Sequence, residues 1–285
     1  MVEAKKLFDA LVKPLVPIHG ADEARSIVFW LLSHTMQLKK TDVLANKTLA
    51  GAYGPSYFQP WIDRLVRHEP IQYVTGETEF YGRRFFVDAS VLIPRPETEE
   101  LVDWILKEYV PLPQPNRILD IGTGSGCIAV TLAKEMKEAQ VTAWDVSPEA
   151  LAVARRNGEV HQTSVRWQRE DILQPVLPVN TQPYNLVVSN PPYVTRAEMA
   201  HMQPNVRAYE PHLALFVEDA HPLLFYERIA AYCQRGLDHL GRCYVEINEQ
   251  FAAKVCRLFL ENGFATAEAY PDLFGKPRFV RAIRA

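Results

Sequence analysis

Two stretches near the start of the chain show the spacing of apolar residues that is typical of helices. Within 24–32 and again within 58–66, apolar residues recur at intervals of three and four, which places them on one side of an α-helix. Asp22 is expected to start the first of these helices. Because proline and glycine separate the helical stretches and no strand-like alternation is seen, residues 1–75 are predicted to form a small helical bundle.

After residue 75 the pattern changes to that of a hairpin followed by a linker. Residues 78–81 and 84–87 are rich in strand-forming side chains and flank Gly82, which predicts a β-hairpin. Further on, two prolines flank Arg95 and hold the backbone there extended. The second of them, Pro96, can open a helix, and the glutamates that follow suit the positive end of its dipole.

From residue 117 onward, strand-like and helix-like stretches alternate. This alternation predicts an α/β fold with a mainly parallel sheet and helices on both of its faces. Ligands of such sheets bind at the carboxyl ends of the strands, where the strand order reverses. The candidate strands are 117–121, 141–145, 164–168, 185–189, 243–247, 265–270 and 278–283.

Composition and charge exclude several classes of function. The 285 residues include 31 basic and 34 acidic side chains, a net charge of −3, which excludes binding of nucleic acid through bulk positive charge. We therefore expect no direct nucleic-acid partner. No apolar run reaches the roughly 18 residues that a membrane span needs, and the first ten residues lack the apolar core of a signal peptide. The expectation is a cytoplasmic protein with no membrane partner.

The four cysteines do not have the spacing of a metal site or of a disulfide framework. Cys127, Cys233, Cys243 and Cys256 form no CxxC pair, so zinc and redox motifs are not expected. A chain of this length can fold around its apolar core without disulfides. We therefore predict reduced thiols and no metal.

A glycine-rich turn follows the first candidate strand and opens a helix. Gly122, Gly124 and Gly126 stand at alternate positions, and Asp120 lies two residues before the first of them. Glycines allow the backbone to turn tightly and to approach a ligand closely. The dinucleotide-binding fingerprint has a different last spacing because it wraps a pyrophosphate. The G-x-G-x-G spacing therefore suits a ligand without phosphates, although a plain strand–helix turn is the alternative interpretation.

Acidic residues at the next two strand ends suggest which ligand this is. Asp145 ends the second candidate strand, where a carboxylate can accept hydrogen bonds from both hydroxyls of a ribose. A helix cap is the alternative role, but Ser147 already provides one. After the third strand, Asp171 can accept from an exocyclic amino group and Ile172 can pack on an adenine. Together these positions describe an adenosine without phosphate, which S-adenosylmethionine fits and NAD fits less well.

The sequence Asn-Pro-Pro-Tyr after the fourth candidate strand fits methyl transfer to a planar nitrogen. Such a nitrogen is a poor nucleophile, and its two N–H groups need acceptors in fixed positions. The side-chain oxygen of Asn190 can accept one N–H group and the carbonyl of Pro191 the other, while Pro192 fixes the direction of that carbonyl. The Tyr193 ring can pack on the planar group. A Pro-Pro pair can also merely end a strand. No separate general base is required before attack.

With these motifs the chain resembles the PrmC/HemK family, the release-factor glutamine methyltransferases. The resemblance covers nearly the whole chain from about residue 55, and the N-terminal helices match only in general character. The matching stretches are 68–77, 80–82, 91–99, Gly122 to Gly126, Asp145, Asn190 to Tyr193, Glu210-Pro211 and 271–275.

The resemblance implies N5-methylation of the glutamine in the Gly-Gly-Gln motif of class 1 peptide release factors. S-adenosylmethionine is the implied donor, and a release factor bound by a monomer is the implied partner. The implied fold is a seven-stranded, Rossmann-like class I methyltransferase domain with a small N-terminal helical bundle. The chain then divides into a substrate-recognition domain at 1–75, a hairpin and linker helix at 76–112 and the methyltransferase domain at 113–285.

The resemblance also assigns roles to single residues. Asn190 is expected to touch both ligands, and Asn190, Pro191 and Tyr193 are the expected catalytic residues. The expected glutamine-binding residues are Asn190, Pro191, Pro192 and Tyr193. The expected cofactor contacts are Gly122, Thr123, Gly124, Ser125, Gly126, Asp145, Ile172 and Asn190, to which the adenosine argument adds Asp171.

One stretch departs from the family and three other functions compete. At 217–222 the chain lacks the usual glycines, which predicts a stiffer loop near the substrate entrance.

A sister enzyme that methylates a ribosomal-protein glutamine shares Asn-Pro-Pro-Tyr, and the linker 93–99 favours the release-factor enzyme over it. A DNA adenine-N6 methyltransferase needs the same acceptors, but the net charge argues against it. The third alternative is a non-catalytic binding protein on this scaffold.

Overall fold

The computed structural model describes residues 2–49, 54–109, 117–175 and 182–285. The predicted boundary between linker and methyltransferase domain, at 112/113, lies outside the described residues. Two compact units are present. The N-terminal unit consists of Met1–Glu77 and Gln203–Tyr209, and the C-terminal unit consists of Thr78–Met202 and Glu210–Ala285.

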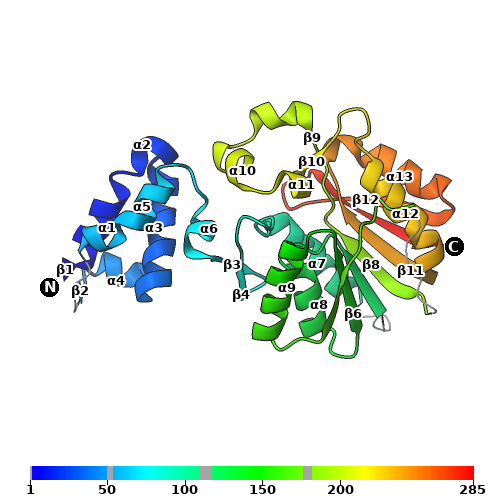
Figure 1. The fold of residues 1–285 in the computed structure, drawn as a ribbon, viewed down its shortest axis with the longest axis horizontal. Coiled ribbons are helices and arrows are strands. Elements are labelled where there is room, and N and C mark those ends of the chain that lie inside the picture. Colours follow the sequence, from blue (N-terminus) through cyan, green and yellow to red (C-terminus); the bar gives the residue numbers. More distant parts are fainter. Residues whose placement is uncertain (1, 50–53, 110–116, 176–181) are drawn as a thin grey trace. The chain divides into compact units, whose positions relative to one another are not determined.

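Helices build the N-terminal unit around one apolar core, and they include both helical stretches that the apolar spacing predicts (Figure 1). The phenolic hydroxyl of Tyr209 donates to the carbonyl of Arg67 at 2.7 Å, which attaches the late segment 203–209 to this unit. The helical elements are α1 (Ala4–Val12), α2 (Val16–His19), α3 (Ala21–Met36), α4 (Lys40–Leu44), η1 (Pro55–Phe58), α5 (Gln59–Leu65), α6 (Ile71–Thr75) and α10 (Pro204–Tyr209).

Two details of this unit correct the sequence-based expectations. Helix α3 begins at Ala21 after Gly20, which has a φ of 78°, so Asp22 lies in the first turn and does not start the helix. There its carboxylate can still face the positive end of the helix dipole. A two-residue antiparallel ladder joins β1 (Val2–Glu3) to β2 (Thr48–Leu49). Strands this short have no alternation to detect, so the purely helical interpretation missed them.

The predicted hairpin is present as β3 (Glu77–Phe80) and β4 (Arg83–Phe86). Tyr81 and Gly82 both have positive φ, 50° and 68°, which is the backbone twist that two-residue hairpin turns favour. The linker helix α7 (Pro96–Glu108) begins at Pro96 as predicted.

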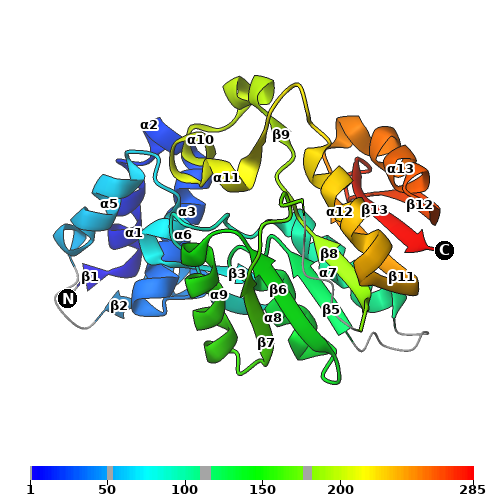
Figure 2. The ribbon, with the colours of Figure 1, turned by 45° about the vertical axis from the view of Figure 1, so that its right-hand side comes forward.

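A seven-stranded sheet in the order β12-β13-β11-β8-β5-β6-β7 forms the centre of the C-terminal unit (Figures 1 and 2). The pairs within β11-β8-β5-β6-β7 are parallel, whereas β13 runs antiparallel to β11 and to β12. All seven candidate strands are therefore confirmed. Their bounds are β5 (Arg117–Ile121), β6 (Gln140–Asp145), β7 (Val165–Arg169), β8 (Tyr184–Ser189), β11 (Leu237–Glu246), β12 (Phe264–Pro271) and β13 (Pro277–Arg284).

Helices cover both faces of this sheet, as predicted for the α/β class I methyltransferase fold. Alternate residues of one strand enter different cores: Val187 packs with α12 (Leu224–Gly236) and α13 (Ala252–Glu261). Leu186 and Val188 pack with α7 and with α8 (Cys127–Glu135). The period of two in a strand thus builds two separate apolar cores. A further helix, α9 (Pro148–Val160), follows β6.

Short elements connect β8 to α12. They are β9 (Val194–Thr195), η2 (Arg196–His201), α11 (His212–Leu215) and β10 (Phe216–Val217), with β9 and β10 paired in parallel. At 217–222 the loop is held to η2: the Arg196 guanidinium contacts the Glu218 carboxylate at 2.9 Å, and the amide of Ala197 donates to Asp219 at 3.0 Å. Within the described parts of the chain, no helix combines the length and the apolar character that crossing a bilayer requires.

Candidate functional site

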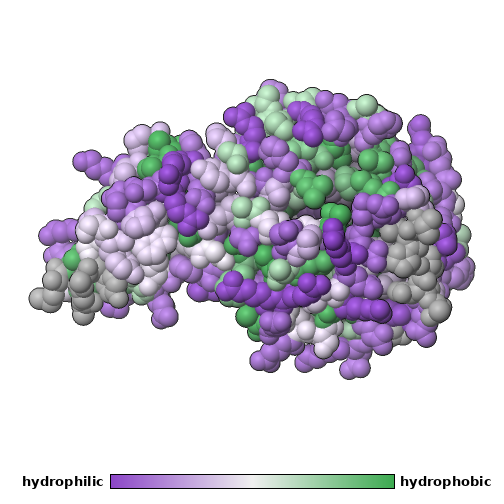
Figure 3. Space-filling view, in the orientation of Figure 1, coloured by the Kyte–Doolittle hydropathy of each residue, from purple (hydrophilic) through white to green (hydrophobic). Residues whose placement is uncertain are grey.

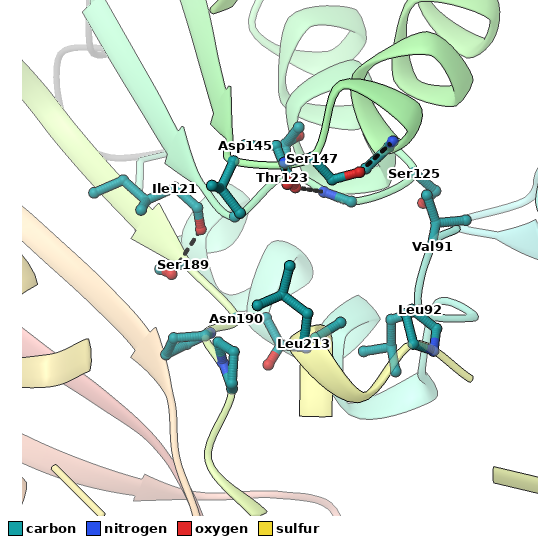
Figure 4. Close-up of a pocket in the computed structure, with 18 of the residues that line it drawn as sticks. Val91, Leu92, Ile121, Thr123, Ser125, Asp145, Ser147, Ser189, Asn190 and Leu213 are labelled. Carbon is teal, nitrogen blue, oxygen red and sulfur yellow. Dashed lines mark hydrogen bonds between the residues drawn. The ribbon is translucent and has the colours of Figure 1, made fainter. Parts of the chain in front are cut away.

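A cavity of about 420 Å³ lies at the carboxyl ends of the strands in the C-terminal unit. Asp145 and Thr123 lie on one side of it, and Asn190 and Leu213 lie across from them (Figure 4). Apolar side chains also gather on the surface of this unit, surrounded by hydrophilic ones (Figure 3). Ten of the predicted site residues line the cavity: Gly122, Thr123, Gly124, Ser125, Asp145, Asp171, Ile172, Asn190, Pro191 and Pro192.

The three glycines of the loop after β5 have two different structural roles. Gly122 and Gly124 have positive φ, 73° and 54°, and a Cβ atom built on either would meet nothing within 4 Å. They therefore leave open space that a ligand can fill. Gly126 also has positive φ, 81°, but does not line the cavity. A Cβ there would come within 3.1 Å of Ala154 and Trp167, so Gly126 serves the packing of the loop.

Asp145 is held by backbone amides at the edge of the cavity. Its Oδ2 accepts from the amide of Gly124 at 2.8 Å and its Oδ1 from the amide of Ser147 at 3.0 Å. Burial raises the pKa of this carboxyl group, and the amide donors oppose that rise. Ser147 caps α9 by accepting from the amide of Ala150 at 3.0 Å, as predicted. The Asp145 carboxylate is thus oriented with further lone pairs available to a ligand.

Asp171 and Ile172 follow β7 and also line the cavity. Ile172 is buried and joins the core beneath. The Asp171 carboxylate accepts from the amide of Leu173 at 2.9 Å and from the side chain of Gln174 at 3.2 Å. Both oxygens of Asp171 therefore have local donors, which fix the side chain in a turn.

Asp120, for which the motif alone predicts no role, bonds to Thr123 and so holds the glycine loop. Its side chain is fully buried at the end of β5. Its Oδ2 accepts from the hydroxyl of Thr123 at 2.6 Å, and burial raises the pKa of the carboxyl group to about 7. Asp120 therefore contacts the loop and does not line the cavity.

Asn190 follows β8, and a residue of the linker helix α7 binds its side chain. Its side-chain Nδ2 donates to the hydroxyl of Thr98 at 2.9 Å. The Thr98 hydroxyl in turn donates to Oε2 of Glu246 at 2.8 Å. Because the Asn190 nitrogen is committed to Thr98, its amide oxygen is the atom left to accept from a ligand.

Tyr193 does not line the main cavity. It lines a smaller one of about 40 Å³, which shares five wall residues with the main cavity: Leu92, Arg95, Asn190, Pro191 and Ala214. Its hydroxyl donates to Oε1 of Glu246 at 2.9 Å, and burial raises the pKa of Tyr193, so the hydroxyl keeps its proton. The two cavities therefore meet at Asn190.

An ion pair fixes the linker before α7. Arg95 Nη2 contacts Oε1 of Glu210 at 2.5 Å, and the amide of Ile93 donates to Oε2 of Glu210 at 3.2 Å. Glu210 is 3% exposed. The linker and the segment after α10 are thus joined at the wall of the cavity, where Arg95 and Pro211 both lie.

Sequence reasoning assigned no function to Thr98, Glu246 or Asn157, all of which are buried. An acidic residue at the end of an apolar strand, as at Glu246, is the signal that could have identified one of them. Asn157 of α9 accepts from the amide of Phe86 at 2.7 Å and donates to the carbonyl of Ser125 at 2.8 Å. It thereby connects the hairpin to the glycine loop.

Comparisons with known proteins identify relatives of both units. The family model of the methyltransferase small domain matches residues 101–207, and that of the PrmC N-terminal domain matches residues 18–76. The second match extends the family resemblance well before residue 55, where the sequence motifs placed its start. The helical unit is thus a form of the family's own N-terminal domain.

Curated relatives match nearly the whole chain. The release factor glutamine methyltransferase of Bacteroides thetaiotaomicron is 41% identical over 271 residues, which cover 95% of this chain and 96% of that protein. That of Flavobacterium psychrophilum is 39% identical over 273 residues and covers 95% of each. Among solved structures, a methyltransferase from Pyrococcus furiosus shares the fold with a TM-score of 0.52 at 17% identity, over 81% of this chain and 99% of that one.

Proposed function

Since the chain belongs to the family of release factor glutamine methyltransferases, we propose that it methylates the glutamine of the Gly-Gly-Gln motif in class 1 peptide release factors. The methyl donor is S-adenosylmethionine and the acceptor atom is the side-chain amide nitrogen, N5. The observation that carries the proposal is the meeting of two cavities at Asn190, in a chain about 40% identical to these enzymes throughout.

The residues around the main cavity suit S-adenosylmethionine. The open space over Gly122 and Gly124 fits a ligand that lies close to the backbone. The oriented carboxylate of Asp145 fits the ribose hydroxyls, and Ile172 offers an apolar surface for the adenine. The residues proposed to contact the cofactor are Gly122, Thr123, Gly124, Ser125, Asp145, Asp171, Ile172 and Asn190, with Gly126 supporting them through packing.

When bound, S-adenosylmethionine supplies an electrophilic methyl group, and the residues of the chain orient the nitrogen that receives it. The amide oxygen of Asn190 and the carbonyl of Pro191 accept the two N–H groups of the glutamine. This arrangement turns the nitrogen lone pair away from both acceptors and stabilises the positive charge that develops on nitrogen. Pro192 and Tyr193 shape the wall on which the planar amide rests.

Proton removal does not require a dedicated base in this reaction. An amide nitrogen becomes strongly acidic only after it is methylated, and its proton can then leave to solvent. Asn190, Pro191 and Tyr193 are therefore proposed to act by positioning and by accepting hydrogen bonds, not by proton abstraction.

The N-terminal unit is the proposed recognition domain for the release factor. Its match to the family's N-terminal domain supports this role. We propose that the protein works as a monomer in the cytoplasm, where its acceptor works, with no membrane or nucleic-acid partner. The net charge of −3 supports a protein acceptor over DNA.

The deciding experiment offers three acceptors to the purified protein and labelled S-adenosylmethionine. A class 1 release factor, a mixture of ribosomal proteins and duplex DNA are incubated in parallel, and incorporation of label is counted. We expect label in the release factor at its Gly-Gly-Gln glutamine. Label only in ribosomal protein or only in DNA would refute the proposal, and calorimetry without detectable cofactor binding would favour a non-catalytic protein.

A further inference from the structure

A chain of buried hydrogen bonds links Asn190 and Tyr193 to one carboxylate. Asn190 donates to Thr98, and both Thr98 and Tyr193 donate to the two oxygens of Glu246. The lengths are 2.9, 2.8 and 2.9 Å, so all three contacts are within ordinary hydrogen-bond distance. Both ends of the Asn-Pro-Pro-Tyr segment therefore share one anchor.

The sheet places this anchor beside the segment. Strands β8 and β11 are parallel neighbours, and Val245 pairs with Ser189. The next residues along the chain are Glu246, the last of β11, and Asn190, which directly follows β8, so both lie at the same edge of the sheet. Thr98 reaches them from the first turn of α7. Glu246 is 1% and Thr98 is 2% exposed, so the hydrogen bond between these two side chains is shielded from water.

The direction of the hydrogen bonds fixes the orientation of the Asn190 amide. In its ionised form Glu246 can only accept, so the Thr98 hydroxyl then gives its proton to Glu246 Oε2. The Thr98 oxygen can then only accept from Asn190, which brings the NH₂ group of Asn190 to this side. The opposite orientation of the amide would bring two acceptor oxygens together.

We propose that Thr98 and Glu246 are positioning residues that set which atom of Asn190 faces the acceptor glutamine. Glu246 orients the Thr98 hydroxyl, Thr98 binds the Asn190 nitrogen, and the Asn190 oxygen is thereby presented to the substrate N–H. This inference rests on the proposed function and deepens it, because it gives the linker helix α7 a direct part in the grip on the acceptor.

The charged and hydroxyl groups around Glu246 are consistent with this role. Burial has the largest effect on the pKa of Glu246 and raises it, whereas the hydrogen bonds from Thr98 and Tyr193 lower it. The charge of Arg278 in β13 lowers this pKa further, and that of Glu97 in α7 raises it. The Tyr226 hydroxyl donates to the backbone carbonyl of Glu246 at 3.2 Å and leaves its carboxylate free for Thr98 and Tyr193. Arg278 itself pairs with Asp272 at 3.5 Å, so it is not the main partner of the carboxylate.

The test compares Thr98→Val, which keeps the shape and removes the hydroxyl, with Thr98→Ser, which keeps the hydroxyl. In the full-length protein with release factor as acceptor, Thr98→Val should lower kcat about 10- to 100-fold. The cofactor Kd should change little, the Tm should fall because the buried Glu246 carboxyl group loses a donor, and Thr98→Ser should recover kcat to within about threefold. A Thr98→Val variant with more than half of the wild-type kcat would overturn the proposal, as would equal losses in the two variants.

Thr131→Val is the matched control. Thr131 is also a buried threonine of this unit, and its hydroxyl has no hydrogen-bond partner among the described residues. Its replacement should leave kcat within about twofold of wild type. If Thr131→Val lost as much kcat as Thr98→Val, the loss would reflect general repacking and the proposal would fail.

A double-mutant cycle with Glu246→Gln tests the carboxylate. If Glu246 acts on Asn190 through Thr98, the kcat loss of the double variant should be clearly smaller than the product of the two single losses. If the kcat loss of the double variant equals the product of the two single losses, Glu246 acts independently of Thr98 and its proposed role is wrong. Every kcat ratio of variant to wild type is measured with the acceptor that the wild-type protein methylates. If the wild-type protein does not methylate a release factor, the proposed function fails, but the roles of Thr98 and Glu246 can still be tested.

Discussion

At the scale of single residues, two asparagines make hydrogen bonds at different parts of the candidate site. Asn190 lines the cavity and bonds to Thr98, whereas Asn157 bonds to Ser125 of the glycine loop. The same kind of side chain thus stands once in a cavity wall and once inside the framework. The difference follows from burial, because Asn157 is fully buried and Asn190 is only half-buried.

Asn190→Ala should separate methyl transfer from cofactor binding. Loss of one of the two acceptors for the glutamine N–H groups should lower kcat by about 100-fold or more. The cofactor Kd, measured by calorimetry, should rise less than about tenfold, because the glycine loop and Asp145 remain. Asn185→Ala is the control, since Asn185 stands at the other end of the same strand and bonds to Arg117. Near-normal turnover of Asn190→Ala would refute the acceptor role.

Alanine at Gly126 and at Gly124 should affect different properties. Gly126→Ala combines a positive φ with contacts at 3.1 Å, so it should lower the free energy of unfolding by about 2–4 kcal/mol. Gly124→Ala meets open space, so its cost should be only about 1 kcal/mol, but its methyl group enters the cavity and should weaken cofactor binding. Urea denaturation and calorimetry on both variants measure the two effects. Equal destabilisation by the two would contradict the packing role of Gly126.

At the scale of elements, the hairpin supports the cofactor loop through α9. Asn157 binds the amide and the carbonyl of Phe86 in β4 and the carbonyl of Ser125 in the loop. His161, just after α9, also contacts the carbonyl of Arg84 at 2.7 Å. The hairpin, which follows the N-terminal unit in the chain, is therefore part of the framework that holds the glycine loop, the proposed cofactor site.

Asn157→Ala should weaken both stability and cofactor binding. It leaves one buried and two partly buried backbone groups without their partner, which should cost about 2–4 kcal/mol of unfolding free energy. Because the carbonyl of Ser125 loses its donor, we also expect a cofactor Kd at least about threefold higher. Asn262→Ala, at the end of α13, removes a side-chain bond to Leu258 outside the site and is the control for cofactor binding. An unchanged Kd would show that the hairpin does not support the loop.

The strands were predictable from the sequence wherever their apolar residues are continuous. The bounds of β5 match the prediction to the residue, whereas β11 begins at Leu237, well before the predicted start at Cys243. Its first half mixes two leucines with polar residues and glycine and carries a register shift between Leu237 and Arg242, so it lacks the pattern of a buried strand. A local run of apolar residues predicts a strand. The start of β11 could not be predicted in this way, because its irregular pairing depends on the neighbouring strand β8.

The site was predictable where its residues follow strands, and not where distant segments meet. The glycine loop, Asp145 and Asn190 each stand at a strand end, which the fold class brings to one edge. Thr98 and Glu246, by contrast, touch across 148 residues of sequence. No local pattern encodes such a contact. The position of Tyr193 beside the smaller cavity also depends on this contact network and could not be read from spacing.

At the scale of the whole molecule, two buried carboxyl groups link folding to pH. Burial raises the pKa of both Asp120 and Glu246 to about 7. In the unfolded chain these groups lose their protons near their ordinary values of 3.8 and 4.5. The folded state therefore binds more protons between about pH 4 and 7. Stability from this source is present in acid and is lost as the pH rises through 7.

Asp120→Asn should remove part of this pH dependence. As the pH rises from 5 to 8, the wild-type protein should lose unfolding free energy relative to the variant, by on the order of 2–4 kcal/mol. The measurement is urea denaturation of both proteins at several pH values. Parallel curves over this range would contradict a raised pKa of Asp120. Asp9→Asn, an exposed change in α1, controls for the loss of one acidic group.

The bond between Thr98 and Glu246 also has a consequence for synthesis on the ribosome. The nascent chain acquires the glycine loop and Asp145 early, but it lacks Glu246 until β11 has been made. Strand β11 lies between β8 and β13, so a chain that stops before it has neither the complete sheet nor the anchor of Asn190. Prematurely terminated chains therefore carry the glycine loop without the Thr98–Glu246 bond, and under the proposed mechanism only a chain translated beyond β11 is expected to be active.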